Sequence, residues 1–205
     1  YPKRAPAYDG MVLPKQQSFA DWNQSLPVGS ASSRRTLQFQ MQYPNCTVHP
    51  IRGNVLTRLE KLDRGEYGAL ILAEAGLQRL GLEHRITRRF SPAEIVPAAG
   101  QGILAVQGRA GEYTDLLQRL NDPQAAFCAK IERAVSKALN GDCTAPIGVY
   151  ADLQGEQVTL YGFYAEDGIG IKSTLTGSVT QAESLVNTFA EQLKQQVQEK
   201  KEAML

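Results

Sequence analysis

The alternation of apolar strand-like segments with amphipathic helices constrains the fold most. The run GALILA (68–73) is apolar at almost every position, which is typical of a strand buried on both faces in a parallel sheet. The preceding segment, 54–65, has apolar residues at helical spacing, with Asn54 placed as an N-cap and Gly65 as a stop. A similar strand and helix come earlier, within 26–42. This alternation predicts an α/β domain with a parallel core.

The second half of the chain predicts a smaller unit of a different kind. A helix is expected over 122–141, with Asp122 as its N-cap, a proline at its first position and a glycine at its end. The segment 147–177 alternates apolar and polar residues between turn signals, which is typical of an antiparallel meander. A long helix with a polar face is expected after Thr180.

These elements predict two domains and a connection between them. The α/β domain is expected over 1–96, and an α+β domain with an antiparallel sheet over 122–205. Between them, 97–121 contains the strand-like run ILAVQG (103–108) and a helical stretch that follows it.

Composition excludes several function classes. The 22 basic and 21 acidic residues leave a net charge of +1, so no overall field attracts nucleic acid or a membrane. No apolar run approaches the roughly 18 residues of a membrane span, and the start of the chain does not resemble a signal peptide. The cysteines Cys46, Cys128 and Cys143 have neither paired nor zinc-ligand spacing, so we expect no metal site and a reducing, cytoplasmic environment.

The segment VGSASSRR (28–35) is the first candidate anion site. A strand ends there and a helix begins, so backbone N–H groups meet the hydroxyls of Ser30 and Ser32. Arg34 and Arg35 fall in the first helical turn, where the helix dipole disfavours positive charge, and a bound anion would restore the balance. A capped helix with solvated arginines explains the same pattern equally well.

The segment IRGNVLTR (51–58) is the second candidate. Arg52 lies at the end of a predicted strand, Asn54 begins a helix, and Arg58 follows one turn later. Ligands of parallel sheets bind outside the carboxyl ends of the strands, and guanidinium groups suit carboxylates and phosphates. Structural ion pairs are the alternative, but two successive strand-to-helix turns with arginines favour anion binding.

Two further segments are candidates for contact with a ligand. In PAAGQG (97–102), Gln101 lies between Gly100 and Gly102, where the chain passes from one domain to the other, so a hinge and a close approach to a ligand are both open. In NGDCTAPIG (140–148), Cys143 lies on a predicted loop without a histidine nearby to activate it. It is a possible point of covalent attachment.

Together, these four segments resemble the porphobilinogen deaminase family over nearly the whole chain. The resemblance implies a periplasmic-binding-protein-like α/β domain and a hydroxymethylbilane synthase activity, a transferase of heme (tetrapyrrole) biosynthesis. Four porphobilinogen units are condensed with release of ammonia, on a dipyrromethane cofactor held by a loop cysteine, which is Cys143 here.

The resemblance also implies roles for other residues. Cofactor contacts fall on residues of both candidate turns and of the domain crossing: Ser30, Ser32, Arg34, Arg35, Arg52, Asn54, Gln101 and Gly102. Substrate contacts fall on Arg52, Arg58 and Arg85. At the first turn this chain has Ala31 and Ser33 where the family usually has a hydroxyl residue and a leucine, which could alter cofactor contacts.

The family's catalytic aspartate belongs to an N-terminal portion that has no counterpart in this sequence, so we assign no catalytic residue and expect the chain alone to be inactive or nearly so. Without that portion, the apolar strand at 103–106 and the helix after it have no sheet to join. We therefore expect this segment to pair with a separate N-terminal chain, to self-associate or to rearrange. A non-catalytic module that binds polycarboxylates or tetrapyrroles, and one half of a split enzyme, are the alternative functions.

Overall fold

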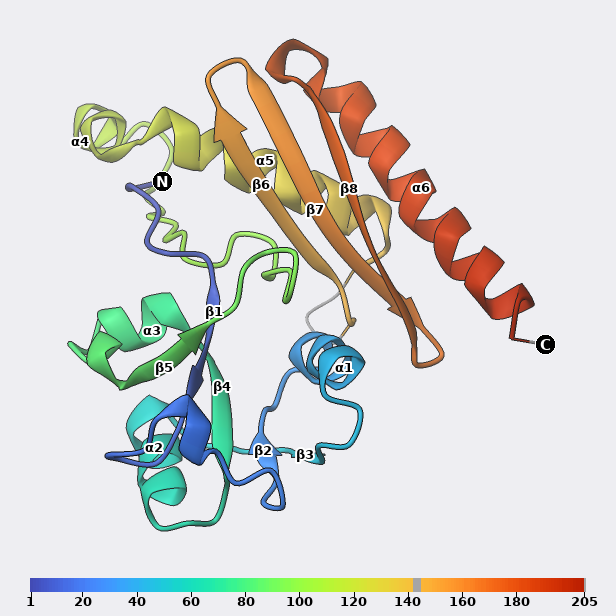
Figure 1. Ribbon diagram of the computed structural model, residues 1–205. Coiled ribbons are helices and arrows are strands. Elements are labelled where there is room, and N and C mark those ends of the chain that lie inside the picture. The colour runs from blue at the N-terminus through green and yellow to red at the C-terminus, as the bar shows by residue number, and fades with distance from the viewer. Residues whose placement is uncertain (142–144, 205) are drawn as a thin grey trace.

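The computed structural model describes residues 1–141 and 145–204, and it contains two sheets, one in each half of the chain (Figure 1). Cys143, the predicted attachment residue, lies outside the described residues. Sheet A has five strands in the order β3-β2-β4-β1-β5. They are β1 (Asp9–Val12), β2 (Val28–Gly29), β3 (Val48–His49), β4 (Ala69–Ala73) and β5 (Ile86–Arg89).

The prediction of an α/β domain with a parallel core is confirmed. Strand β2 pairs in parallel with both β3 and β4, whereas β1 runs antiparallel to β4 and β5, so the sheet is mixed. Strand β4 is buried on both faces, as GALILA predicts. Ile71 packs in one cluster with Phe39, and Leu70 packs in another with Leu59 and Leu62.

Three α-helices and two short 3₁₀ helices belong to this half of the chain. They are α1 (Ser33–Gln42), α2 (Val55–Asp63), α3 (Glu74–Gln78), η1 (Phe19–Asp21) and η2 (Glu83–Arg85). The cap predicted at Asn54 is correct, since its side chain accepts the Thr57 N–H at 2.9 Å. Of the two serines at the first turn, Ser32 caps α1, and its Oγ accepts the Arg35 N–H at 3.4 Å. Gly65 follows α2 with a φ of 81°, a conformation that favours glycine.

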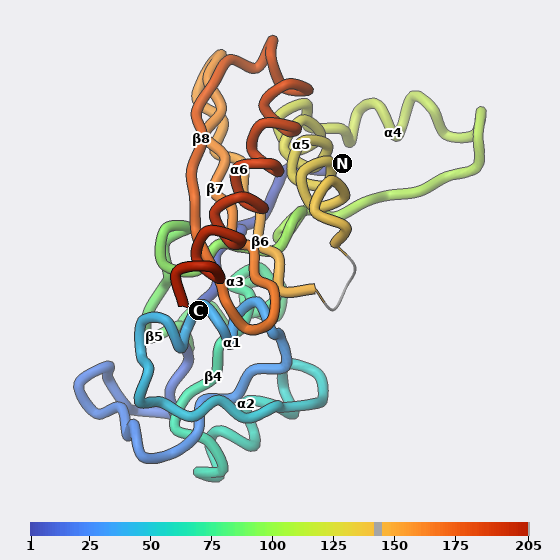
Figure 2. Tube along the Cα trace, turned by 90° about the vertical axis from the view of Figure 1, so that its right-hand side faces the viewer, coloured from blue at the N-terminus to red at the C-terminus, as the bar shows by residue number. Residues whose placement is uncertain are grey.

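The second half of the chain is the predicted antiparallel meander with helices packed against it. Sheet B contains β6 (Gly148–Gln154), β7 (Gln157–Glu166) and β8 (Ile169–Ser178), and the helices are α5 (Pro123–Ala138), η3 (Val179–Gln181) and α6 (Ala182–Glu202). Helices α5 and α6 lie side by side on one face of the sheet (Figure 2). Gly162 of β7 permits this packing, since a Cβ there would lie 2.7 Å from Phe189 and Leu193 side-chain atoms of α6.

One prediction of local structure is wrong, and one predicted helix ends earlier than expected. The run 103–108 forms no strand, because no described strand lies beside it to complete a ladder, and most of it is exposed. The helix expected over 122–141 ends at Ala138, because Asn140, rather than the glycine after it, takes the left-handed conformation at φ 56°. The helical stretch after 108 does form, as α4 (Thr114–Leu120), which projects away from both sheets (Figure 2).

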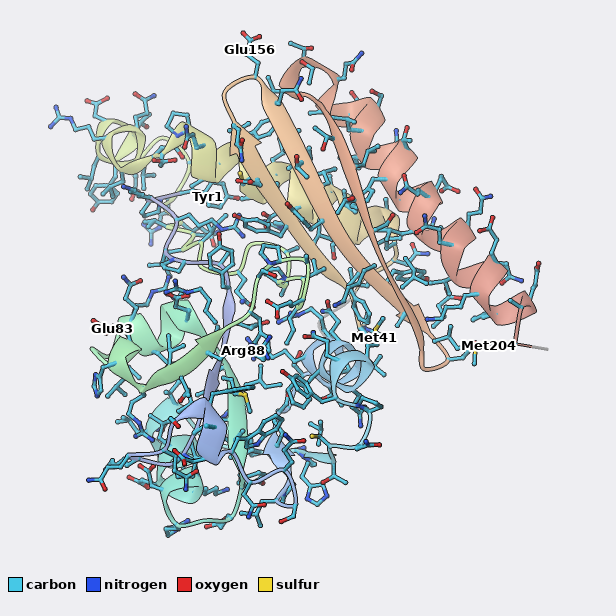
Figure 3. All side chains as sticks on the ribbon, in the orientation of Figure 1. Tyr1, Met41, Glu83, Arg88, Glu156 and Met204 are labelled. Carbon is cyan, nitrogen blue, oxygen red and sulfur yellow. The ribbon has the colours of Figure 1, made fainter. Side chains whose placement is uncertain are left out.

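The two halves meet where α1 approaches the beginning of β6. Met41 of α1 and Glu156 of the β6–β7 turn mark opposite ends of sheet B (Figure 3). At the α1 end, the Val149 N–H donates to the Pro97 carbonyl at 2.8 Å, and Val96 packs with Phe163. Within the described part of the chain, no helix is long and apolar enough to cross a bilayer.

Candidate functional site

A buried carboxylate, Asp9, organises the first candidate turn. It is 0% exposed at the start of β1, and its oxygens bind the guanidinium of Arg34 at 2.8 Å and Arg35 Nε at 3.0 Å. Gln101 joins them: its Nε2 donates to Asp9 Oδ1 at 2.9 Å, and its Oε1 accepts from Arg34 at 3.3 Å and from Arg35 at 3.4 Å. Residues of β1, α1 and the domain crossing therefore form one hydrogen-bonded network.

The network fixes the charge state of its members. Burial raises the pKa of the Asp9 carboxyl, but the guanidiniums of Arg34 and Arg35 lower it by more, so the pKa lies below its ordinary value. Asp9 therefore supplies negative charge at the N-terminus of α1, where the helix dipole disfavours the two arginines. One carboxylate against two guanidiniums leaves one positive charge at the turn.

The backbone of the domain crossing is tied to the same helix. Arg34 Nη1 donates to the Val96 carbonyl at 2.6 Å. The buried Gln38 side chain accepts the Val96 N–H at 2.7 Å and donates to its carbonyl at 3.1 Å. Arg34 thus has structural partners on two sides, which restricts its guanidinium to one position.

The two predicted serines lie at this turn. Ser32 is the N-cap of α1, and Ser30 is buried, with its Oγ 3.3 Å from the Ser32 N–H. The predicted residues Ser30, Ser32, Arg34, Arg35 and Gln101 are therefore brought together.

The second candidate turn is more open. Asn54 uses its side-chain oxygen to cap α2, and Arg58 Nε donates to the Gly53 carbonyl at 2.8 Å. Arg52 is exposed, and within the described residues its guanidinium has no ion-pair or hydrogen-bond partner. Arg52 is therefore the cation of this turn that is most available to a ligand.

Arg85 is placed apart from both turns. Its guanidinium binds the Asp63 carboxylate at 2.7 Å and the Leu13 carbonyl at 3.3 Å, and its side chain is 12% exposed. Asp63 ends α2, whereas Asn54 precedes its first residue, so the length of the helix, about 13 Å, separates Arg85 from the second turn.

Gly100 and Gly102, in the segment that connects the two halves of the chain, both lie against other parts of the chain. Gly102 has a φ of 84°, and a Cβ there would lie 2.4 Å from the Ala5 carbonyl oxygen. The Gly100 N–H donates at 2.7 Å to Glu132, a fully buried carboxylate of α5 that also accepts from Arg4 at 2.6 Å. The close backbone approach at Gly102 is therefore to Ala5.

A cavity of about 1360 Å³ lies between the first turn and α5. Its lining includes Ser32 and Arg34 on one side and basic residues of α5 on the other. Gly141 and Ala145, which precede and follow 142–144 in the sequence, line it as well.

Comparison with known proteins identifies the family. The profile described as "Porphobilinogen deaminase, dipyromethane cofactor binding domain" matches residues 1–116, and "Porphobilinogen deaminase, C-terminal domain" matches 126–195. The chain belongs to the porphobilinogen deaminase family. The first profile ends within the exposed segment 103–120, at residue 116.

Curated relatives agree with this assignment. The porphobilinogen deaminase of Acetivibrio thermocellus is 50% identical over 92% of this chain and 64% of its own length. That of Alkaliphilus oremlandii is 45% identical over 94% of this chain and 64% of its own. The chain thus spans 64% of the length of each of these two relatives, just under two thirds. A solved periplasmic binding protein of Salmonella typhimurium is a distant match, with 20% identity and a TM-score of 0.31 over 62% of each chain.

Sequence reasoning missed two buried carboxylates. Asp9 and Glu132 pair with arginines 25 and 128 positions away, so no local motif marks them. It also missed the basic residues of α5 that line the cavity. Their helical spacing was a readable signal, but the cavity opposite them arises only from the tertiary fold.

Proposed function

We propose that this protein is a hydroxymethylbilane synthase, which condenses four porphobilinogen units head to tail and releases ammonia. The observation that carries the proposal is the cavity between the first turn and α5. Four cations line it and no carboxylate does, among the residues that the structure describes. A ligand made of pyrrole rings with carboxylate side chains requires such a lining.

The residues of the first turn fit a cofactor that carries carboxylates. Arg34 and Arg35 keep one net positive charge after Asp9 is counted, and Asp9 and Gln101 hold both guanidiniums in place. Ser30 and Ser32 would contribute hydroxyl groups. We propose that these residues, with Gln101, Gly102, Arg52 and Asn54, hold a dipyrromethane attached to Cys143. The attachment is supported by Gly141 and Ala145, which line the same cavity.

Substrate binding is proposed for Arg52, Arg58 and Arg85. Arg52 has a free guanidinium within the described part of the chain, so it is the strongest of the three. The Nε of Arg58 donates to the Gly53 carbonyl, so only the other N–H groups of its guanidinium can bind a carboxylate while this bond is kept. Arg85 would have to exchange Asp63 for substrate, which makes it the weakest candidate.

When bound, the dipyrromethane would supply the nucleophilic pyrrole carbon for the condensation with porphobilinogen. An aspartate is expected to stabilise the cation that forms when ammonia leaves. Asp9 does not suit this role, because two guanidiniums and an amide occupy its oxygens and it is fully buried. We propose that this aspartate lies outside the 205 residues and that these residues alone are inactive.

The exposed segment 103–120 is proposed as the attachment point for that further part of the protein. Leu104, Val106 and Leu116 are 52%, 51% and 55% exposed, and α4 has no buried residue. Apolar side chains of this size gain roughly 1.5–3 kcal/mol each on burial. A covering chain is thus favoured, either in the same polypeptide or in a separate one, and a second copy of this chain is the alternative. A cytoplasmic location, supported by the free thiols of Cys46 and Cys128, is part of the proposal.

Intact-mass measurement tests the cofactor assignment. The protein expressed from its complete reading frame should carry a dipyrromethane adduct that Cys143→Ser abolishes. Cys46→Ser is the matched control, because Cys46 is buried in the core and distant in sequence from the cavity residues near Cys143. An unmodified Cys143 in the folded protein would overturn the assignment. An adduct without turnover of porphobilinogen would instead indicate a binding module.

A further inference from the structure

Asn140 is followed by a glycine, which distinguishes it from the other five asparagines of the chain. It lies directly after α5: the helix stops at Ala138, Leu139 is its C-cap, and Asn140 has a left-handed φ of 56°. Few residues with a side chain adopt this conformation at low cost, and asparagine and aspartate are the main ones. The end of α5 therefore favours asparagine, aspartate or glycine at position 140.

The packing around position 141 requires glycine. A Cβ there would lie 2.9 Å from the Ser136 carbonyl oxygen and 2.9 Å from Cδ1 of Ile147. The carbonyl belongs to the backbone of α5, so it cannot move aside without distorting the helix. The fold thus favours an Asn-Gly pair at the end of α5. In such a pair the backbone nitrogen after asparagine is least shielded, because glycine has no Cβ.

The carboxamide of Asn140 is free to react. It is exposed, and it has no hydrogen-bond partner among the residues that the structure describes. The carboxamide of Asn54, in contrast, accepts the Thr57 N–H at 2.9 Å. The Gly141 N–H is bonded, since it donates to the Ser136 carbonyl at 2.9 Å. That bond closes the last turn of α5, and helix ends fray at little cost in free energy. A local opening is therefore enough to release the Gly141 nitrogen.

We propose that Asn140 is a site of spontaneous deamidation. The Gly141 backbone nitrogen forms a bond to the carboxamide carbon of Asn140, and the bond from this carbon to the side-chain nitrogen breaks. The side-chain nitrogen leaves as ammonia and takes the proton of the Gly141 N–H. One water molecule then opens the succinimide at either of its carbonyls, which gives aspartate or isoaspartate. This inference does not depend on the proposed function.

Both products change the end of α5. Each adds a negative charge there, which the helix dipole disfavours at a C-terminus. Isoaspartate also lengthens the main chain by one carbon directly before Gly141, where the packing leaves little room. The last turn of the helix should therefore open more often. Gly141 and Lys137 both line the cavity, so the modification lies at its edge.

Peptide mapping by mass spectrometry tests the proposal. The protein expressed from its complete reading frame is incubated in mildly alkaline buffer and digested at intervals, and enzymatic methylation detects isoaspartate in the peptides. Asn187, exposed within α6 and followed by a threonine, is the internal control. Conversion at Asn140 should be at least about tenfold faster, because a helix opens more easily at its end than in its interior. Equal rates at the two asparagines would overturn the proposal.

Hydrogen exchange tests the effect on the helix. Amides in the last turn of α5 should exchange about two- to fivefold faster in incubated wild type than in fresh protein. Asn140→Gly is the matched control, because glycine keeps the left-handed conformation and has no carboxamide. Its exchange should be the same before and after incubation. Unchanged exchange in deamidated wild type would overturn the predicted loosening, and so would an equal increase in incubated Asn140→Gly.

Discussion

Asp9 determines how much positive charge the first turn presents to a ligand. Without it, the guanidiniums of the buried Arg34 and the partly buried Arg35 would lose the carboxylate that pairs with both of them. Arg34 is 4% exposed, and burial lowers the pKa of its guanidinium while Asp9 opposes that shift. Removing one partner of a buried ion pair costs about 3–5 kcal/mol. Asp9→Asn should therefore lower the free energy of unfolding in urea by this amount. Asp115→Asn, at an exposed aspartate of α4 whose side chain has no ion pair or hydrogen bond within the described residues, is the control and should change it little.

The pH dependence of this loss checks its cause. The pKa of Asp9 is lower in the folded protein than in the unfolded chain, where it is about 3.9. The stabilisation is therefore complete above that value and is lost as the pH falls toward the folded pKa. The difference in unfolding free energy between the wild type and Asp9→Asn should shrink as the pH falls below about 4. A difference that stays constant from neutral pH to pH 3 would mean that Asp9 acts through packing alone.

At the scale of elements, local signals predicted the chain better than long-range ones. The caps Ser32, Asn54 and Asp122 each bond to a backbone N–H three residues later, so the sequence shows them directly. The run 103–108 has the composition of a strand, but a strand exists only beside a partner, and composition does not supply one. The approach of α5 to the first turn likewise depends on how the two halves pack, which no local pattern encodes.

Helix α4 should be the least protected helix when the 205 residues are studied alone. It has no buried residue, whereas α6 buries Phe189 and Leu193 against sheet B. Backbone amides of α4 should therefore exchange with solvent much faster than those of α6, as measured by hydrogen exchange and mass spectrometry. In the complete protein, the same amides should exchange at least about tenfold more slowly, because a covering chain suppresses local opening. Protection of α4 equal to that of α6 in the 205 residues would contradict its proposed role as an attachment point.

At the scale of the whole molecule, Glu132 links segments from three regions. Its carboxylate accepts from Arg4 near the N-terminus at 2.6 Å, from Gly100 in the crossing at 2.7 Å and from the Ala151 N–H of β6 at 2.8 Å. Arg4 also donates to the Gln101 carbonyl, and its guanidinium lies 5.0 Å from the centre of the Tyr150 ring. The cavity-lining cations of α5 and the Asp9 network are thus held on opposite sides of the cavity partly by one buried ion pair.

Arg4→Met should therefore destabilise the molecule in a pH-dependent way. Burial raises the pKa of Glu132 above its ordinary value, and Arg4 opposes this shift, so the pKa rises further once Arg4 is removed. When the pKa of a carboxyl is higher in the folded protein than in the unfolded chain, the unfolded chain loses its proton more readily. Stability therefore falls as the pH rises and is lowest above the folded pKa. The loss in unfolding free energy should accordingly be larger at neutral pH, at about 3–5 kcal/mol, than near pH 4. Arg64→Met, which removes an exposed ion pair with Glu66, should cost no more than about 1 kcal/mol. If Arg4→Met is equally destabilising at both pH values, Arg4 acts by packing on Tyr150 and not by holding the charge of Glu132.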